Sequence, residues 1–168
     1  MESVSKPRGT VGSQHGRLWG FLMRHAINPF MRRSLRSRFH RRIGSDMIME
    51  LSFRGRTTGK LYSFPIGYMQ VGSEIVCYSP FGWWTNLQGG APVTVTLRGE
   101  QKAGTADVCT DTGTIAKGMA DYLRHNPGDA FFFRVKVGKD REPVIADVER
   151  AAGENVQIRI ALQEATAR

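Results

Sequence analysis

Residues 47–78 read MIMELSFRGRTTGKLYSFPIGYMQVGSEIVCY, and this stretch decides the fold. From Met47 to Phe53 every second residue is apolar, which is the period of a half-buried strand. Gly and Thr dominate Arg54 to Lys60 and predict a turn. Two further strands are predicted over residues 61–71 and 74–78, with Gly72 and Ser73 as a tight turn between them.

The rest of the chain continues this pattern of short strands. Strands are predicted over 93–97, 102–108, 131–137 and 156–162, and a loop or short helical turn with two tryptophans over 80–90. Asp111 predicts the cap of a helix over 112–125, which Asn126-Pro127-Gly128 would end, and a short helix is expected over 146–152. Short strands with helices at the ends and in one insertion predict a mainly β protein with flanking helices, an antiparallel barrel or sandwich.

Length and composition are typical of a soluble globular protein. The chain has 168 residues, of which 40% are hydrophobic and 23% charged. It has neither a run of about 18 apolar residues nor a secretory leader pattern, so we expect a cytoplasmic protein. Cys77 and Cys109 are the only cysteines, and in that compartment both are expected to be free thiols.

The positive charge is confined to the start of the chain. Residues 1–45 carry ten Lys and Arg against Glu2 alone, whereas residues 46–168 carry equal numbers of basic and acidic residues. We therefore expect two parts, a basic N-terminal segment with amphipathic helices (1–45) and a barrel domain (46–168). The segment could pack on the barrel, contact an anionic membrane surface peripherally, or bind nucleic acid, in that order of preference.

Recognised catalytic patterns are absent from the sequence. The four histidines are scattered, and no metal-ligand spacing, nucleophile motif or Walker phosphate loop is present. We therefore assign no catalytic residue and no metal site. If the protein is an enzyme, a bound cofactor must carry the difficult step.

Two segments could bind a ligand. The turn with Arg56, Thr57, Thr58 and Lys60 combines positive charge, hydroxyls and exposed backbone N–H groups, and could hold a phosphate or carboxylate. It could equally be a solvated basic hairpin. In the second segment, residues 79–87, two adjacent tryptophans could stack on a flat ring or could simply pack the end of the barrel.

The order and spacing of these segments resemble a known family. The chain has LSFRGRTTGK at 51–60, PIGY at 65–68, Ser79, GWWTNL at 82–87 and PVTV at 92–95. This resembles the deazaflavin-dependent nitroreductase family, a branch of the split β-barrel flavin and deazaflavin oxidoreductases. The resemblance implies a split β-barrel that transfers a hydride from a reduced deazaflavin (coenzyme F-420, with FMN as an alternative) to a small planar acceptor such as a quinone or nitroaromatic.

The resemblance also implies which residues bind the cofactor. Four would hold its anionic tail: Arg56, Thr57, Thr58 and Lys60. Five would lie near its ring or linker: Pro65, Tyr68, Ser79, Gly82 and Trp83. A homodimer is the usual state of such proteins.

The sequence departs from the family pattern at two places. Thr57 replaces a usual Lys or Arg, and the segment between Ser79 and Trp83 is short. These departures leave a second hypothesis, a non-catalytic split-barrel carrier of a lipid, haem or other apolar ligand.

Overall fold

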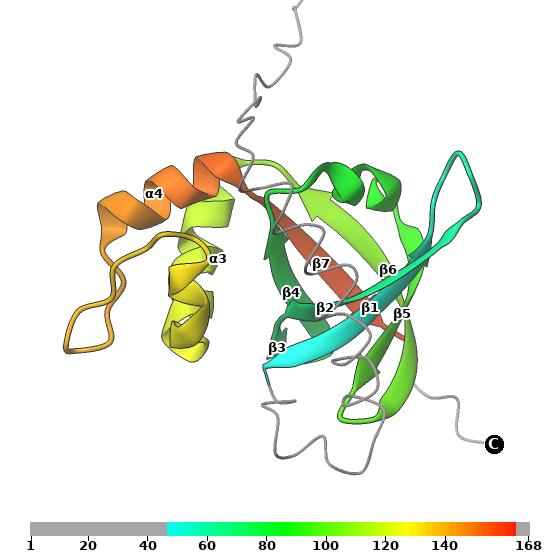
Figure 1. The fold of residues 1–168 in the computed structure, drawn as a ribbon, viewed down its shortest axis with the longest axis horizontal. Helices are drawn as coiled ribbons and strands as arrows, with labels where there is room; N and C mark the ends of the chain where they lie inside the picture. Colours follow the sequence, from blue (N-terminus) through cyan, green and yellow to red (C-terminus); the bar gives the residue numbers. More distant parts are fainter. Residues whose placement is uncertain (1–46, 164–168) are drawn as a thin grey trace, which may run out of the picture.

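The computed structural model describes residues 47–163, so the predicted helices of the basic N-terminal segment lie outside the described residues. Seven strands form one antiparallel sheet in the order β2-β1-β5-β6-β7-β4-β3. Their bounds are β1 Ile48–Arg54, β2 Leu61–Gly67, β3 Met69–Val71, β4 Glu74–Ser79, β5 Ala91–Leu97, β6 Glu100–Cys109 and β7 Val156–Leu162. The curled sheet forms a split barrel (Figure 1), which confirms the predicted fold class.

The helices form one insertion between β6 and β7. Helix α3 (Thr112–His125) is followed by the 3₁₀ turn η4 (Pro127–Phe131) and by α4 (Ile145–Glu154). Both α-helices lie together on one side of the barrel, and a further 3₁₀ turn, η3 (Gly82–Leu87), lies at one end of it (Figure 1). The Asp111 carboxylate accepts a hydrogen bond from the Thr114 N–H at 2.8 Å, so the predicted cap and both predicted ends of α3 are confirmed.

Strand β4 is shared by two apolar cores. Ile75 and Cys77 point into the barrel and pack with side chains such as Leu51 and Ile158. Val76 and Tyr78, on the opposite face, pack under α3 and α4. Because side chains alternate along a strand, a strand covered on both faces has no exposed polar stripe. β4 therefore joins the helical insertion to the barrel.

One predicted strand is split into two. The segment 61–71 was expected to be continuous, but β2 pairs with β1 and β3 pairs with β4, at opposite ends of the sheet order. Tyr68 lies at the change of partner, where its N–H donates to the Met47 carbonyl at 2.9 Å. The periodicity of a strand does not specify its neighbour, so the sequence pattern could not show this change.

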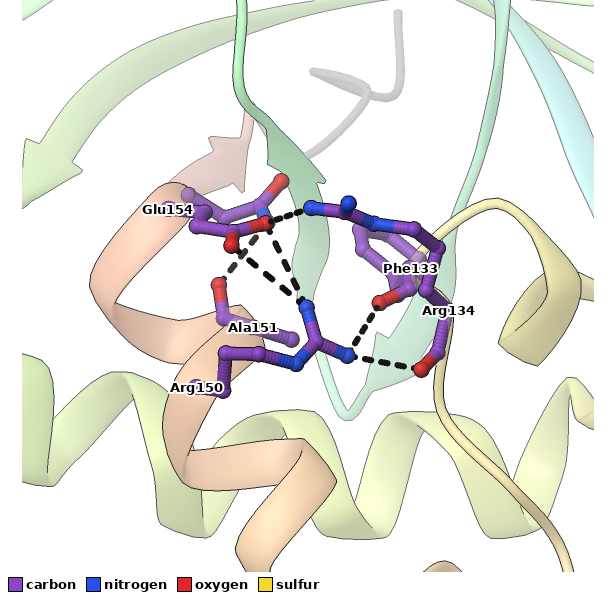
Figure 2. Close-up of polar contacts among 6 residues, drawn as sticks. Phe133, Arg134, Arg150, Ala151 and Glu154 are labelled. Carbon is purple, nitrogen blue, oxygen red and sulfur yellow. Dashed lines mark hydrogen bonds and ion pairs between the residues drawn. The ribbon is translucent and has the colours of Figure 1, made fainter. Parts of the chain in front are cut away.

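The predicted strand over 131–137 is wrong. The segment forms the end of η4 and turns, and only Val137 makes an isolated bridge, to Pro143. Figure 2 shows the reason: the Arg150 guanidinium of α4 donates to the carbonyls of Phe133, at 3.3 Å, and of Arg134, at 2.6 Å. The Glu154 carboxylate also accepts from Arg134 at 2.6 Å. Hydrogen bonds to helix side chains thus replace those of a neighbouring strand.

Candidate functional site

The turn between β1 and β2 has a well-braced backbone. The Gly55 N–H donates to the Lys60 carbonyl and the Gly59 N–H to the Gly55 carbonyl, both at 2.9 Å. Gly59 has a φ of +63°, a conformation that side chains disfavour. The Thr58 hydroxyl accepts from the Lys60 N–H at 3.3 Å, so its acceptor function already serves the turn.

The turn is joined to η3 through Asn86. The Arg56 N–H donates to the Asn86 side-chain oxygen at 3.0 Å, and the Asn86 amide nitrogen donates to the Trp83 carbonyl at 2.8 Å. The Arg56 guanidinium also reaches the Thr85 carbonyl, at 3.5 Å. Two segments 30 residues apart therefore form one structural unit.

Positive charge is concentrated on this unit. Arg54, Arg56 and Lys60 are exposed, and none of them has an acidic partner within 4 Å among residues 47–163. The Arg54 guanidinium donates to the Gly59 carbonyl at 3.1 Å, and the Lys60 ammonium lies 6.0 Å from the centre of the Tyr62 ring. Three cations on or beside one short turn, with no ion pair among the described residues, make the turn attractive to an anion.

Trp83 is part of an aromatic cluster at the same end of the barrel. Its ring stacks on Phe53, with centroids 5.6 Å apart and planes at 24°, and meets Phe64 edge-on at 4.8 Å. Phe53 stacks in turn on Tyr62 at 5.5 Å. Trp83 therefore does pack the end of the barrel, one of the two roles predicted for the tryptophans. Because Trp83 is only half-buried, part of it remains accessible beside the basic turn.

The other predicted residues lie at varied places. Gly82 begins η3 beside Trp83 and is exposed. Ser79 is buried at the end of β4, where its hydroxyl accepts from the Phe81 N–H at 3.1 Å. Pro65 is half-buried on β2, opposite Glu50.

Tyr68 is remote from the turn. It is buried in the barrel core and follows the far end of β2, which at about 3.3 Å per residue is roughly 20 Å from the turn. The structure thus brings together the turn, Gly82 and Trp83, and leaves Tyr68 apart. Asn86, which joins the turn to η3, was part of the sequence pattern but was not among the predicted ligands.

Burial raises the pKa of several groups in the barrel and in the helical insertion. Burial raises the pKa of Cys77 to about 12. Burial also raises the pKa of Tyr78 to about 12, although a hydrogen bond from Gln157 opposes it. The pKa values of Tyr122 and Asp129, beneath the helices, are raised by burial as well. These groups lie outside the turn and η3, whose contribution is charge and hydrogen-bond donors.

Comparison with known proteins supports the fold. No family model and no curated protein matches the sequence. Among solved structures, the conserved hypothetical protein Rv2991 from Mycobacterium tuberculosis is similar with a TM-score of 0.54 and 14% identity, over 95% of this chain and 87% of that one. Protein Atu2129 of unknown function from Agrobacterium tumefaciens has a TM-score of 0.49 and 13% identity, over 72% of this chain and 52% of that one. An F420 reductase has a TM-score of 0.42 and 13% identity, over 70% of this chain and 87% of that one.

None of the helices in the described part of the chain is long and apolar enough to cross a membrane. Within residues 47–163, His, Cys, Asp and Glu side chains form no group of three that could hold a metal ion.

Proposed function

We propose that this protein is an oxidoreductase that transfers a hydride from a reduced deazaflavin coenzyme to a small planar acceptor of the quinone or nitroaromatic type. The observation that carries the proposal is the Asn86 contact between the basic turn and η3. It unites the two halves of the sequence pattern on which the resemblance rests. FMN is the alternative cofactor.

The residues of the turn fit the anionic tail of such a coenzyme. Arg56 and Lys60 supply positive charge that no acidic side chain of residues 47–163 pairs with, and Thr57 and Thr58 are exposed. Gly55 is packed closely, since a Cβ there would lie 3.0 Å from both Thr58 Oγ1 and the Tyr62 ring. A side chain at this position would push the turn out of shape. These residues would bind and orient the coenzyme through its tail.

The protein's part in the reaction is positional. When bound, the coenzyme supplies the hydride. The half-buried Trp83 offers an apolar surface beside which a flat ring can be placed. Contacts with Phe53 and Phe64 fix the orientation of the Trp83 ring. Holding donor and acceptor in a suitable geometry supplies much of the rate enhancement for such a transfer.

The test is a coenzyme titration followed by an activity assay with the full chain. Binding is measured by fluorescence of oxidised coenzyme F-420, and activity by its reoxidation from the reduced form in the presence of menadione. Arg56→Ala should raise Kd about tenfold or more, since charge-assisted hydrogen bonds contribute about 1.5–3 kcal/mol. Thr57→Lys should tighten binding by adding a cation.

Lys102→Ala is the matched control, because it removes one exposed cation from β6, outside the candidate site. Its Kd should equal that of the wild type. Absence of binding at micromolar coenzyme would overturn the proposal. If native mass spectrometry then shows a co-purified lipid or haem, the carrier hypothesis replaces it.

A further inference from the structure

The loop between α3 and α4 displays two aromatic side chains to solvent. Phe131 is 81% exposed and Phe132 is 62% exposed. Their rings meet edge-on, with centroids 5.9 Å apart, so they contact each other. Val144 and Ile145, where the loop enters α4, are also exposed. Large projecting apolar side chains of this kind mark interaction sites when they occur together.

A braced backbone holds the two rings outward. The Val135 N–H donates to the Ala130 carbonyl at 2.9 Å, which closes the loop at its base, and both residues are buried. Phe133 points the other way and packs edge-on against Tyr78 and Tyr122. Arg150 binds the carbonyls of Phe133 and Arg134 (Figure 2). The exposure of Phe131 and Phe132 is therefore a built feature of the turn.

The same loop carries an excess of positive charge. Residues 131–145 contain four Lys and Arg against Asp140 and Glu142. Glu142 is paired with Arg124 at 2.8 Å. The side chains of Lys136, Lys139 and Arg141 are exposed and form no ion pair with the described residues, although the Lys136 backbone N–H donates to the Asp147 carboxylate at 3.0 Å.

We propose that this loop is a docking surface for an anionic lipid bilayer. Phe131 and Phe132 enter the boundary between headgroups and acyl chains, and Lys136, Lys139 and Arg141 contact the anionic headgroups. Two exposed rings and three exposed cations on one loop suit a soft, negatively charged surface. The loop lies at the opposite end of the molecule from the β1–β2 turn (Figure 1), so this surface is separate from the proposed cofactor site.

Vesicle binding by the full chain tests this proposal. Co-sedimentation is measured with phosphatidylcholine vesicles with and without phosphatidylserine. The wild type should bind the anionic vesicles preferentially, and the double variant F131S/F132S should partition about tenfold less. The triple variant K136Q/K139Q/R141Q should lose the preference for phosphatidylserine and most of its sensitivity to salt.

Val71→Ser is the matched control, since Val71 is 55% exposed on β3, outside the loop. It should bind vesicles as the wild type does. Far-UV circular dichroism verifies that each variant is folded. Phe131→Trp provides a measurement that does not depend on the double variant. The fluorescence emission of the new tryptophan, obtained by subtracting the wild-type spectrum, should shift to the blue when anionic vesicles are added.

Three results would overturn the proposal. The first is absence of wild-type binding to anionic vesicles, and the second is equal binding by F131S/F132S. The third is the absence of a Phe131→Trp shift. If the double variant instead dissociates a wild-type dimer in sedimentation experiments while vesicle binding is unchanged, a second copy of the chain covers the loop.

Discussion

The barrel interior and the layer beneath the helices are both buried, but they differ in chemistry. The barrel interior is predominantly aliphatic and aromatic, and includes Leu51 and Ile158. The layer beneath the helices also contains polar pairs. Between β4 and β7 the Gln157 amide donates to the buried Tyr78 hydroxyl at 2.9 Å, and within the insertion the Tyr122 hydroxyl donates to the half-buried Asp129. Apolar packing tolerates several arrangements, whereas buried hydrogen bonds require one. The Asn126 amide nitrogen at the end of α3 donates to the Tyr68 carbonyl at 2.8 Å, and this buried bond joins the insertion to the barrel.

The largest expected effect comes from removing one leucine from each core. Leu51→Ala in the barrel and Leu123→Ala beneath the helices remove the same buried side chain, so each should lower the free energy of unfolding by about 2–5 kcal/mol. Because β4 belongs to both cores, each variant should still unfold in one transition. Urea denaturation followed by tryptophan fluorescence and by far-UV circular dichroism measures both quantities.

Leu61→Ala is the control for this pair, because Leu61 is exposed on β2. Its effect should be within about 0.5 kcal/mol. If Leu123→Ala separates the two spectroscopic transitions, the cores unfold independently, and the role given to β4 is wrong.

Two glycines of α3 should respond to alanine with opposite signs. A Cβ at Gly118 would lie 2.5 Å from the Gln157 amide nitrogen and 2.7 Å from the Tyr78 hydroxyl. Gly118→Ala should therefore destabilise the protein by about 1–2 kcal/mol, despite the better helix propensity of alanine. A Cβ at Gly113 would lie 3.6 Å from the Asp111 carboxylate, an ordinary contact.

Gly113→Ala is accordingly expected to be neutral or to stabilise by up to about 1 kcal/mol. Thermal and urea unfolding of the two variants compare the signs directly. A stabilising Gly118→Ala would show that the Tyr78–Gln157 pair moves aside at little cost.

The smallest effect is a dependence on pH through Asp129. Burial raises the pKa of this carboxyl above its ordinary value of 3.8, and the hydrogen bond from Tyr122 partly opposes the rise. The folded protein therefore binds the proton more tightly than the unfolded chain does. The resulting stabilisation is present below pH 3.8 and is lost as pH rises through the folded-state pKa.

Asp129→Asn removes this titration. The free energy of unfolding of the variant relative to the wild type should rise with pH across that window and then become constant, as urea titrations at a series of pH values can show. Tyr122→Phe should extend the window to higher pH, because the opposing hydrogen bond is gone. If the difference in free energy of unfolding between Asp129→Asn and the wild type does not change with pH, Asp129 has the same pKa in the folded and unfolded states.

Local signals in the sequence predicted much of the fold. The bounds of α3 follow from Asp111 at one end and Asn126-Pro127 at the other, and β1 and β5 follow from alternation. Residues 131–137 also alternate, but the bonds from Arg150 come from a helix that begins eight residues after the segment ends. Periodicity indicates which side chains can be buried, but it does not indicate which groups form hydrogen bonds with the backbone.

The candidate site shows the same division. The sequence by itself determined that residues 55–60 form a basic turn and that residues 82–87 hold two tryptophans, because Gly, Thr and Arg content is local information. Only the tertiary structure decided that Asn86 joins these segments, that Trp83 stacks on Phe53, and that Tyr68 lies at the far end of β2. The physical reason is that these relations depend on strand pairing across the sheet, which brings together residues far apart in the chain.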